Sequence, residues 1–368
     1  MIYNDFKGIK LSSLGMGAMR FPIVDGDDKR IDIEKTKEMV EYAFSQGINY
    51  IDTAWVYHGG NSESVLGEIL KDYPRENFYL ATKFPGFDKN NFGKIEEIFE
   101  KQLEKCQTNY FDFYLLHNVS EGNVDLYLDD DLGLIKYLLK QKELGRIKYI
   151  GFSVHGSLPT LKKFLEKTAC IMEFCQLQIN YIDYTFQNAK EKIELMDSYN
   201  IPVWVMEPLR GGKLATLKDE YKDKLNIYRD ETPVAWAFRF LQTFPEIKMI
   251  LSGMSNFDQL KENIEIFNDY KPLNKEEIEA ILDIARLMSR GIPCTSCKYC
   301  VEYCPMGLDI PRLLRLANEK AFMGSMPWSI NSIDASKRFD ACIGCKSCEA
   351  VCPQNIKISE VMEQMAKK

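Results

Sequence analysis

The chain has 368 residues, of which 45% are apolar and 27% are charged, and its formal charge is −7. This composition is that of a globular protein and excludes a mainly disordered chain. No basic stripe is visible, which argues against a nucleic-acid binder, and no uncharged window of about 18 residues could form a membrane-spanning helix. Because the N-terminus also lacks the charged-then-apolar pattern of a secretory signal, we expect a cytoplasmic protein.

Short apolar runs alternate with amphipathic stretches from residue 1 to about residue 290. Each run has the length of a strand and is rich in β-branched or aromatic residues. The eight predicted strands are LGMGAMRF at 14–21, INYIDTA at 48–54, NFYLATK at 77–83, FDFYLLH at 111–117, IKYIGFSV at 147–154, CQLQINY at 175–181, PVWVMEP at 202–208 and IKMILSG at 247–253. The predicted helices that follow them span Ile33–Gln46, Asn61–Leu70, Lys94–Lys105, Leu132–Leu144, Leu158–Lys167, Gln187–Tyr199, Thr232–Thr243 and Asn256–Phe267.

Strict alternation of strands and helices predicts parallel strands with right-handed crossovers. Eight such units over about 250 residues are what a closed (β/α)8 barrel, a TIM barrel of the α/β class, requires. A doubly wound open sheet is the alternative, but the turn at Gly15–Gly17 lacks the third glycine of a dinucleotide-binding fingerprint. After a further predicted helix, Lys275–Met288, we place a domain boundary at Ser289–Pro293. The barrel is therefore expected over residues 1–290 and a second, smaller domain over residues 291–368.

Eight of the 11 cysteines form two quartets of identical spacing, the second shifted by 48 residues (from 294 to 342). Each quartet reads C-x2-C-x2-C-x3-C-P, the spacing of bacterial 4Fe–4S ferredoxins. Structural zinc and a disulfide framework are the alternatives, but zinc uses two separated pairs and disulfides do not suit a reducing compartment. The predicted ligands of two 4Fe–4S clusters are Cys294, Cys297, Cys300, Cys304, Cys342, Cys345, Cys348 and Cys352. The other cysteines, Cys106, Cys170 and Cys175, are expected to be inert and mostly buried.

The cysteine region resembles the two-cluster bacterial ferredoxin module. The resemblance implies that the closely spaced cysteines of a quartet bind one cluster and that the fourth binds the other. The long connector from Pro305 to Ala341 begins with a predicted helix, Ile310–Lys320, which favours a mainly α-helical ferredoxin-like domain. Electron transfer is the usual role of such a pair of clusters, and a mainly structural role is the alternative.

Three consecutive strands of the predicted barrel end in titratable residues. Asp52 ends the second strand, Lys83 the third and His117 the fourth, while Tyr57 lies in the loop after Asp52. In a (β/α)8 barrel the chemistry takes place at these strand ends. A lysine ammonium held by an aspartate lowers the pKa of a nearby tyrosine, and a histidine can polarise a carbonyl. These residues predict a general acid that protonates a carbonyl oxygen as hydride arrives at the carbon.

The segment INYIDTAWVYHGGNSESVLGEIL at 48–70 resembles the aldo-keto reductase signature, and the resemblance extends over about residues 8–270. The catalytic aspartate, tyrosine, lysine and histidine of that family fall on Asp52, Tyr57, Lys83 and His117. The resemblance implies an oxidoreductase that uses NAD(P)H to reduce a small aldehyde or ketone, with Tyr57 as the proton donor. His58, beside Tyr57, is expected to be an exposed loop residue.

The same resemblance implies cofactor contacts, position by position. Ser153 and Gln178 should contact the nicotinamide carboxamide, and Met206 replaces the tyrosine that stacks on the nicotinamide ring. The loop before Leu214 should approach the pyrophosphate, with backbone N–H groups exposed by its glycines and charge from its basic residues. The expected contacts in that loop are Leu209, Arg210, Gly211, Gly212 and Lys213.

The helix after the eighth strand bears on the choice between NADH and NADPH. Family members that use NADPH place basic residues there, whereas Gly253 and Gln259 occupy those positions in this chain and Asp258 adds a negative charge. We therefore expect NAD(H) to be preferred over NADP(H), although Ser255 and the helix N-terminus offer a phosphate some hydrogen bonds. The expected contacts in this stretch are Gly253, Ser255, Asn256, Gln259 and Asn263.

Three function classes remain open. The first is a carbonyl reductase that is coupled to, or stabilised by, two iron–sulfur clusters. The second is an electron-transfer protein that passes electrons between a nicotinamide or flavin and a ferredoxin-type partner. The third, a regulatory protein with a reductase shape, is disfavoured by the intact set of catalytic residues. Hydride carries two electrons and each cluster passes one, so a flavin is a possible intermediary, although the sequence contains no flavin motif.

Overall fold

The computed structural model describes residues 1–186, 188–288, 291–294, 297–352 and 354–367. The chain divides into two compact units, Met1–Ile278 and Glu279–Lys368. This division falls inside the helix α12 (Lys275–Met288), and the domain limits predicted from the sequence stay a prediction. Some residues used in the sequence-based predictions lie outside the described part, namely Gln187, Ser289, Arg290 and Pro353.

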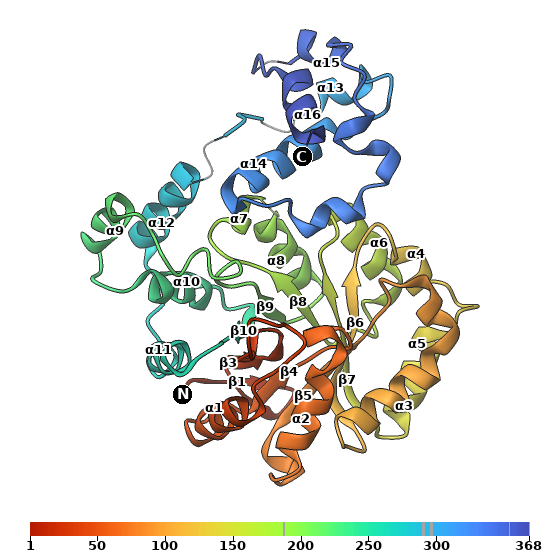
Figure 1. The fold of residues 1–368 in the computed structure, drawn as a ribbon, viewed down its shortest axis with the longest axis vertical. Coiled ribbons are helices and arrows are strands. Elements are labelled where there is room, and N and C mark those ends of the chain that lie inside the picture. Colours follow the sequence, from red (N-terminus) through yellow and green to blue (C-terminus); the bar gives the residue numbers. More distant parts are fainter. Residues whose placement is uncertain (187, 289–290, 295–296, 353, 368) are drawn as a thin grey trace. The chain divides into compact units, whose positions relative to one another are not determined.

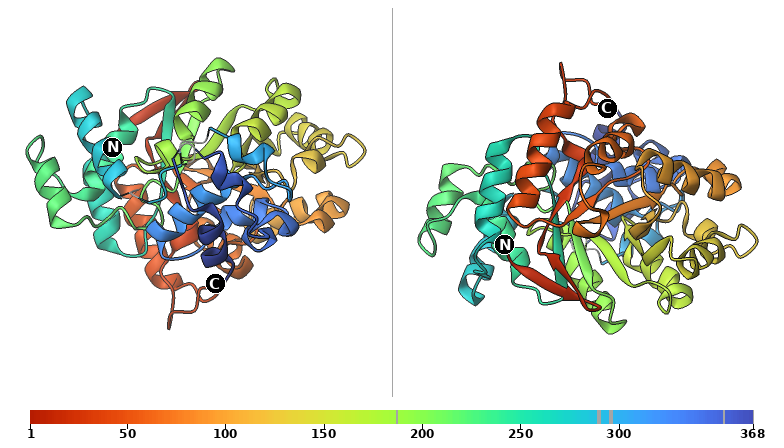
Figure 2. Two further views of the ribbon diagram at one scale, coloured as in Figure 1. Left: turned by 90° about the horizontal axis from the view of Figure 1, so that it is seen from above. Right: turned by 90° about the horizontal axis from the view of Figure 1, so that it is seen from below.

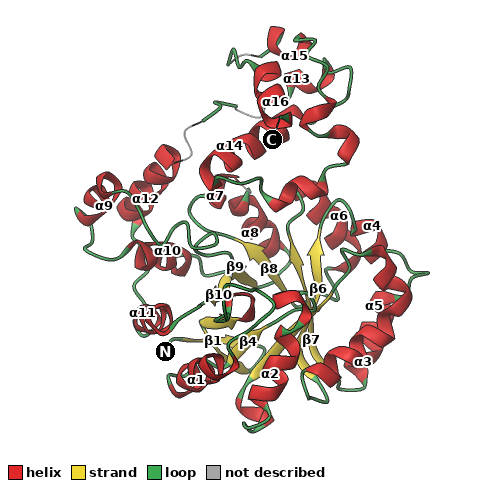
Figure 3. Cartoon of the chain, viewed as in Figure 1, coloured by secondary structure: helices red, strands yellow, loops and turns green. Residues whose placement is uncertain are grey.

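Eight parallel strands close into a barrel, as predicted (Figures 1 and 3). Around the ring the strands follow the order β10-β3-β4-β5-β6-β7-β8-β9, and β9 pairs with β10 to close it. Strands that are consecutive in the chain are therefore neighbours in space, as repeated right-handed βα units require. The barrel strands are β3 (Leu14–Gly17), β4 (Tyr50–Asp52), β5 (Tyr79–Phe84), β6 (Phe111–Val119), β7 (Ile147–Val154), β8 (Phe174–Gln178), β9 (Val203–Met206) and β10 (Ile247–Gly253).

Helices lie on the outside of the barrel strands (Figures 1 and 2). Asp32 and Thr232 each cap a helix by accepting a hydrogen bond from a first-turn N–H, which would otherwise lack a partner. The short α4 and α7 and the largely polar α9 were not predicted. The helices of this unit are α1 (Ile33–Ser45), α2 (Ser62–Leu70), α3 (Ile95–Lys105), α4 (Val124–Tyr127), α5 (Leu134–Glu143), α6 (Leu158–Thr168), α7 (Asp183–Phe186), α8 (Ala189–Ser198), α9 (Asp219–Asn226), α10 (Pro233–Gln242), α11 (Phe257–Phe267) and the start of α12.

An antiparallel hairpin precedes the barrel and was not predicted. It consists of β1 (Tyr3–Phe6) and β2 (Ile9–Ser12), joined by a tight turn in which Lys7 and Gly8 both have positive φ. Its Phe6 packs in one buried cluster with side chains from the first half of several barrel strands, among them Phe113, Phe174 and Trp204. The hairpin therefore closes the amino-terminal end of the barrel. The opposite end is left for the site.

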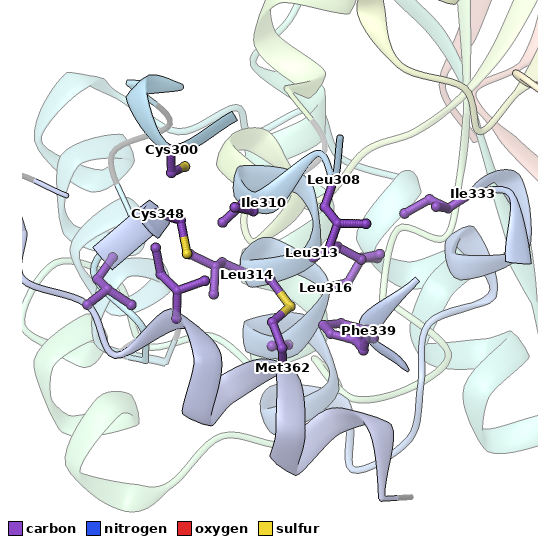
Figure 4. Packing of buried hydrophobic residues seen from close by; sticks show 13 residues of the cluster. Cys300, Leu308, Ile310, Leu313, Leu314, Leu316, Ile333, Phe339, Cys348 and Met362 are labelled. Atoms are coloured by element: carbon purple, nitrogen blue, oxygen red, sulfur yellow. The ribbon is translucent and has the colours of Figure 1, made fainter. Parts of the chain in front are cut away.

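The second unit contains four further helices, and its described residues form no strand, as the prediction of a mainly α-helical domain requires. Its helices are α13 (Tyr299–Glu302), α14 (Ile310–Met323), α15 (Ser347–Ala350) and α16 (Ile358–Ala366). Leu313, Leu314 and Met362 form the centre of its small apolar core, to which Cys300 and Cys348 also belong (Figure 4). In neither unit do the described residues include a helix with the length and apolar character needed to cross a membrane.

Candidate active site and cluster sites

Asp52, Tyr57 and Lys83 are brought together at the carboxyl end of the barrel. Asp52 is the last residue of β4, Lys83 lies near the end of β5, and Tyr57 begins the 3-10 turn after β4, Tyr57–Gly60. The Lys83 ammonium donates three hydrogen bonds, to Asp52 Oδ1 at 2.5 Å, to the carbonyl oxygen of Thr53 at 2.8 Å and to the hydroxyl oxygen of Tyr57 at 3.1 Å. Because the phenol oxygen accepts from Lys83, the hydroxyl proton of Tyr57 remains available to another acceptor.

His117 joins this group from β6. Its ring centre lies 6.2 Å from that of Tyr57, at 83° between the ring planes, and Phe87 packs on it from another direction at 5.5 Å. The register of β6 against β7 shifts between Leu116 and Val119, and such a bulge re-aims side chains at a strand end. The Nδ1 atom of His117 is buried and has no hydrogen-bond partner among the described residues. The ring is therefore placed beside Tyr57 with hydrogen-bonding capacity unused.

Burial and charge set the protonation states of these groups. Burial raises the pKa of the Tyr57 phenol, and the nearby Lys83 charge only partly offsets this. Burial alone would lower the pKa of Lys83, but the Asp52 carboxylate and Tyr57 outweigh it, so that the pKa is raised. Burial, with the charges of Lys83 and His155, holds the pKa of His117 well below its usual value. Near neutral pH the site therefore holds a phenol, an ammonium and a neutral imidazole.

Gln176 completes the group and was not singled out in the sequence. It lies on β8, and its amide nitrogen donates to Asp52 Oδ2 at 2.6 Å. Asp52 thus has a partner on each oxygen, Lys83 on one and Gln176 on the other. A glutamine inside an apolar strand gives no sequence signal of this kind, because its partner lies 124 residues away in the chain.

The residues expected beside the nicotinamide lie at the same end of neighbouring strands. Ser153, near the end of β7, accepts a hydrogen bond from the N–H of Asn118 at 2.8 Å. Gln178, the last residue of β8, donates to Asp183 Oδ2 at 2.8 Å. Met206 is the last residue of β9 and is half-buried. The structure therefore brings these three predicted contacts to one rim, with the first two held by hydrogen bonds.

In the loop after β9, the sequence predicts that Arg210 or Lys213 offers a charge to the cofactor. Arg210 is 1% exposed and forms an ion pair with the buried Asp183, with Nη2 and Oδ1 3.1 Å apart. Its charge is thus used inside the protein, because the buried carboxylate of Asp183 needs a cation. Lys213 is exposed, and Gly211 and Gly212 have φ values of +64° and +90°, a conformation that favours glycine. Leu209 is half-buried.

The expected contacts at α11 are joined by hydrogen bonds to one another. The N–H of Ser255 donates to Gln259 Oε1 at 2.8 Å, and the N–H of Gln259 donates to Asn256 Oδ1 at 3.0 Å. The Asn263 amide donates to the hydroxyl oxygen of Ser252 at 3.0 Å in the interior. These contacts fix the first turn of α11 in shape without adding a positive charge.

Arg20 is an exposed cation that sequence reasoning missed. It ends the 3-10 turn Ala18–Arg20, where the first strand was predicted to continue to residue 21. Its side chain packs against Gly253, where an added Cβ would come within 2.7 Å of the Arg20 Cγ. Its Nη2 would lie 4.0 Å from a Cβ at Gly211, and its backbone oxygen accepts from the hydroxyl of Ser255 at 2.8 Å. Arg20 thus lies between the two loops expected to hold the cofactor phosphates.

Of two smaller expectations, the one for His58 is wrong, and the one that Cys106, Cys170 and Cys175 are mostly buried holds for two of the three. His58, which was expected to be exposed, is only 3% exposed, and its Nδ1 lies 2.7 Å from the carbonyl oxygen of Asp28. Cys170 is exposed, whereas Cys106 and Cys175 are buried as expected.

The clustered cysteines line two cavities in the second unit. Each cavity takes three cysteines from one quartet and the last cysteine of the other, which is the crossed arrangement that the ferredoxin resemblance implies. Ile358, at the start of α16, lines both cavities. The two sets of lining cysteines are Cys304, Cys342, Cys345 and Cys348, and Cys294, Cys297, Cys300 and Cys352.

The donor chemistry of these cavities fits a four-iron cluster. Each is lined by four thiols and by apolar side chains such as Leu308 or Leu314, and soft thiolate donors select iron–sulfur clusters. Within the described residues, no three His, Cys, Asp or Glu side chains converge on one point as the ligands of a single ion would. A cubane takes one thiolate per iron, so its ligands surround a volume rather than a point.

The two halves of the second unit also repeat in backbone conformation. Lys298 and Lys346 follow the second cysteine of each quartet, and both adopt left-handed conformations, with φ of 67° and 61°. Each lysine precedes a short helix, α13 or α15, and these helices lie against each other. A left-handed residue at such a turn directs successive N–H groups to one side, which suits an anionic cluster.

Similarity to known proteins agrees with this geometry. The chain is 25% identical over 304 residues to an uncharacterized oxidoreductase of Bacillus subtilis, 27% over 308 residues to L-galactose dehydrogenase of Arabidopsis thaliana, and 28% over 322 residues to NADH-specific methylglyoxal reductase of Escherichia coli. These matches cover 74–75% of this chain and 92–94% of the relatives. A solved aldo-keto reductase from Bacillus halodurans, in its holo form, has the same fold, with a TM-score of 0.64 and 24% identity over 77% of this chain and 96% of that one.

Two family models account for the two parts of the sequence. The model described as "Aldo/keto reductase family" matches residues 13–286, and the model described as "4Fe-4S dicluster domain" matches residues 293–356. The chain therefore belongs to the aldo/keto reductase family of oxidoreductases and carries a 4Fe–4S dicluster domain at its C-terminus.

Proposed function

We propose that this enzyme reduces an aldehyde or ketone with NAD(P)H, that Tyr57 donates the proton, and that two 4Fe–4S clusters are coupled to the reaction or stabilise the protein. The observation that carries the proposal is the Lys83 ammonium, which bonds to both Asp52 and Tyr57 in the interior. A buried ammonium at the phenol oxygen is the feature that a tyrosine needs to act as an acid.

Each residue of the group has a distinct task. The nicotinamide supplies the hydride when bound. Tyr57 gives its hydroxyl proton to the substrate oxygen, and Lys83 stabilises the phenolate left behind. Asp52 keeps Lys83 charged and holds its ammonium group beside Tyr57. His117, as a neutral imidazole, donates a hydrogen bond to the same substrate oxygen and polarises the carbonyl.

NADH is the proposed cofactor. The loops on either side of Arg20 fit a dinucleotide, since Gly212 has open space beside its backbone and α11 presents its N-terminus. Arg20 and Lys213 are the cations available to the pyrophosphate. Neither Gly253 nor Gln259 offers a charge to a 2′-phosphate, which favours NADH. The similarity to a relative whose name specifies NADH supports the same choice.

Electron transfer is the second candidate function. It is favoured by the shared lining residue Ile358, since one side chain that borders both cavities implies that the two clusters lie close enough to exchange electrons. In this function, electrons pass between the nicotinamide and a ferredoxin-type partner. A flavin is the group that could divide the two electrons of a hydride into single electrons. A 450 nm flavin band in the visible spectrum of anaerobically purified protein would favour this second function.

The test of the first function is Tyr57→Phe. Carbonyl reduction with NADH should fall by at least about 10²-fold, the low end for the loss of a general acid, while NADH binding stays near the wild-type value. Tyr137→Phe is the matched control, since the Tyr137 hydroxyl on α5 is buried without a partner in the described structure. Equal turnover of Tyr57→Phe and wild-type protein would overturn the assignment.

A further inference from the structure

The hydrogen bond between Gln176 and Asp52 crosses the whole barrel. In the closed ring, β8 lies four places from β4 in either direction, so the two strands are diametrically opposite. Alternate residues of β8 point inward. Phe174 belongs to the apolar layer at the hairpin end, Gln176 lies above it, and Gln178 reaches the rim. A barrel interior is normally filled by bulky apolar layers, so a polar contact across it needs a reason.

The hydrogen-bonding capacity of Lys83 supplies that reason. An ammonium has three N–H groups, and all three of those on Lys83 are used, by Asp52 Oδ1, Thr53 and Tyr57. Lys83 therefore has no donor left for Asp52 Oδ2. A buried carboxylate oxygen without a donor is costly, and Gln176, itself 1% exposed, is the side chain that reaches it. A carboxylate only accepts, so the amide must present its nitrogen.

We infer that Gln176 is a positioning residue of the proton-transfer site: it holds Asp52 Oδ2 so that Oδ1 stays directed at Lys83, and through Lys83 it sets the acidity of Tyr57. The inference rests on the proposed function. Among the members of the group, the hydrogen bond described for the Gln176 side chain is with Asp52. It therefore acts through Asp52 alone.

The consequence of losing this amide has a definite direction. Without a donor on Oδ2, the Asp52 carboxylate can rotate, and Oδ1 is no longer held at the Lys83 ammonium. Lys83 is then held less closely beside the phenol, and Tyr57 becomes a weaker acid. In the described structure, the titratable groups facing this centre are Lys83, Tyr57, His117, Tyr50 on β4 and Glu207, which directly follows β9.

The first test is Gln176→Leu, which keeps the volume and removes the donor. Carbonyl reduction should fall at least about tenfold at unchanged NADH affinity, because misplacing a catalytic group lowers the rate of the chemical step. In the reverse direction, alcohol oxidation needs the Tyr57 phenolate, so its rate falls at low pH. The apparent pKa of that fall should be higher in the variant than in the wild-type enzyme. The matched control is Gln242→Leu, the same change at a buried glutamine on α10, which should alter stability but neither the rate nor the pH profile.

Gln176→Glu keeps the test decisive if the leucine variant does not fold. A protonated glutamic acid can still donate to Asp52, whereas an ionised one repels it. The variant should therefore keep its carbonyl-reducing activity at low pH and lose it as the pH rises. The wild-type pH profile should not show this loss. Wild-type pH profiles in both variants would overturn the inference. Because Tyr57→Phe is measured beside them, a Tyr57 variant without effect would instead overturn the proposed function itself.

Discussion

In the barrel, the groups of the candidate active site hold one another in place: Lys83 is fixed by three acceptors and Asp52 by two donors, all supplied by the chain. In the second unit, the contacts described for the cavity thiols are fewer. The N–H of Leu308 lies 3.5 Å from Cys304 Sγ, and Ser347 bonds to the Cys345 thiol through its backbone and its side chain. The rest of the described lining is largely apolar and leaves the arrangement of the thiols to the group they bind. A proton-transfer site can be built by protein contacts alone, whereas a cluster site is completed by its metal.

The strongest test of this difference is iron removal. Cys300 and Cys348 belong to the small core of the second unit, so chelation should abolish hydrogen-exchange protection in α14 and α16 while the barrel strands keep theirs. Protection in α14 that survives complete loss of iron would contradict the comparison.

Intact protein should contain about eight irons and matching acid-labile sulfide, because each cluster has four.

Substitution of a single cysteine tests one cavity independently of the other. Cys348→Ser should lower the iron content from about eight to about four per chain, since one complete ligand set remains. NADH-dependent carbonyl reduction should persist, because every hydrogen bond described around Lys83 comes from the barrel. Cys170→Ser, at an exposed cysteine outside the quartets, serves as the control for both measurements. Loss of carbonyl reduction together with one cluster would show that the barrel reaction depends on the clusters.

Arg20 provides a test of how far the barrel prepares its cofactor site. Arg20→Gln should raise the dissociation constant of NADH about tenfold and weaken its dependence on salt, because a charge-assisted phosphate contact is lost. Arg30→Gln, at an exposed arginine paired with Asp25, should leave binding unchanged. A titration with NADPH beside NADH shows whether Arg20 serves a 2′-phosphate instead: only then would the variant weaken NADPH binding far more than NADH binding.

The smallest expected effect is that of pH. The pKa of His117 is held well below its usual value of about 6.5, and that of Tyr57 is raised above about 10. Tyr57 thus keeps its proton, and His117 stays neutral, throughout the neutral range. Carbonyl reduction should therefore be flat between about pH 6 and pH 9 and fall only where Tyr57 ionises. A rate that changes with an apparent pKa near 6.5 would place an ionising histidine in the reaction.

Sequence reasoning found the parts of the molecule that carry local signals. The eight strands were predicted from short apolar runs, and the ends of Ile147–Val154 and Ile247–Gly253 agree with the observed β7 and β10. The cysteine spacing marked both cavities, and Asp52, Lys83 and His117 were marked by their positions at strand ends. In each case the signal lies in a few neighbouring residues.

Features that depend on distant partners were missed or misjudged. The ion pair of Arg210 was missed because its partner, Asp183, lies 27 residues earlier in the chain, at the start of α7. Gln176 was overlooked because its partner is on the opposite side of the ring, and Arg20 because it gains its neighbours only when the barrel closes. The N-terminal hairpin has strands of four residues, too short for a clear alternation. Tertiary contacts, rather than local preference, decide these positions.

The crossed sets of lining cysteines bear on the ancestry of the second unit. Each half of the repeat supplies three cysteines to one cavity and one to the other, so that, with these cysteines as the ligands, neither half completes a site by itself. An ancestral peptide with one quartet could have bound clusters only by pairing with a second copy of itself, as a symmetric dimer. Duplication and fusion of its gene would then turn that dimer into one chain. Such an origin predicts matching backbone conformations in the two halves, and Lys298 and Lys346 share the left-handed one.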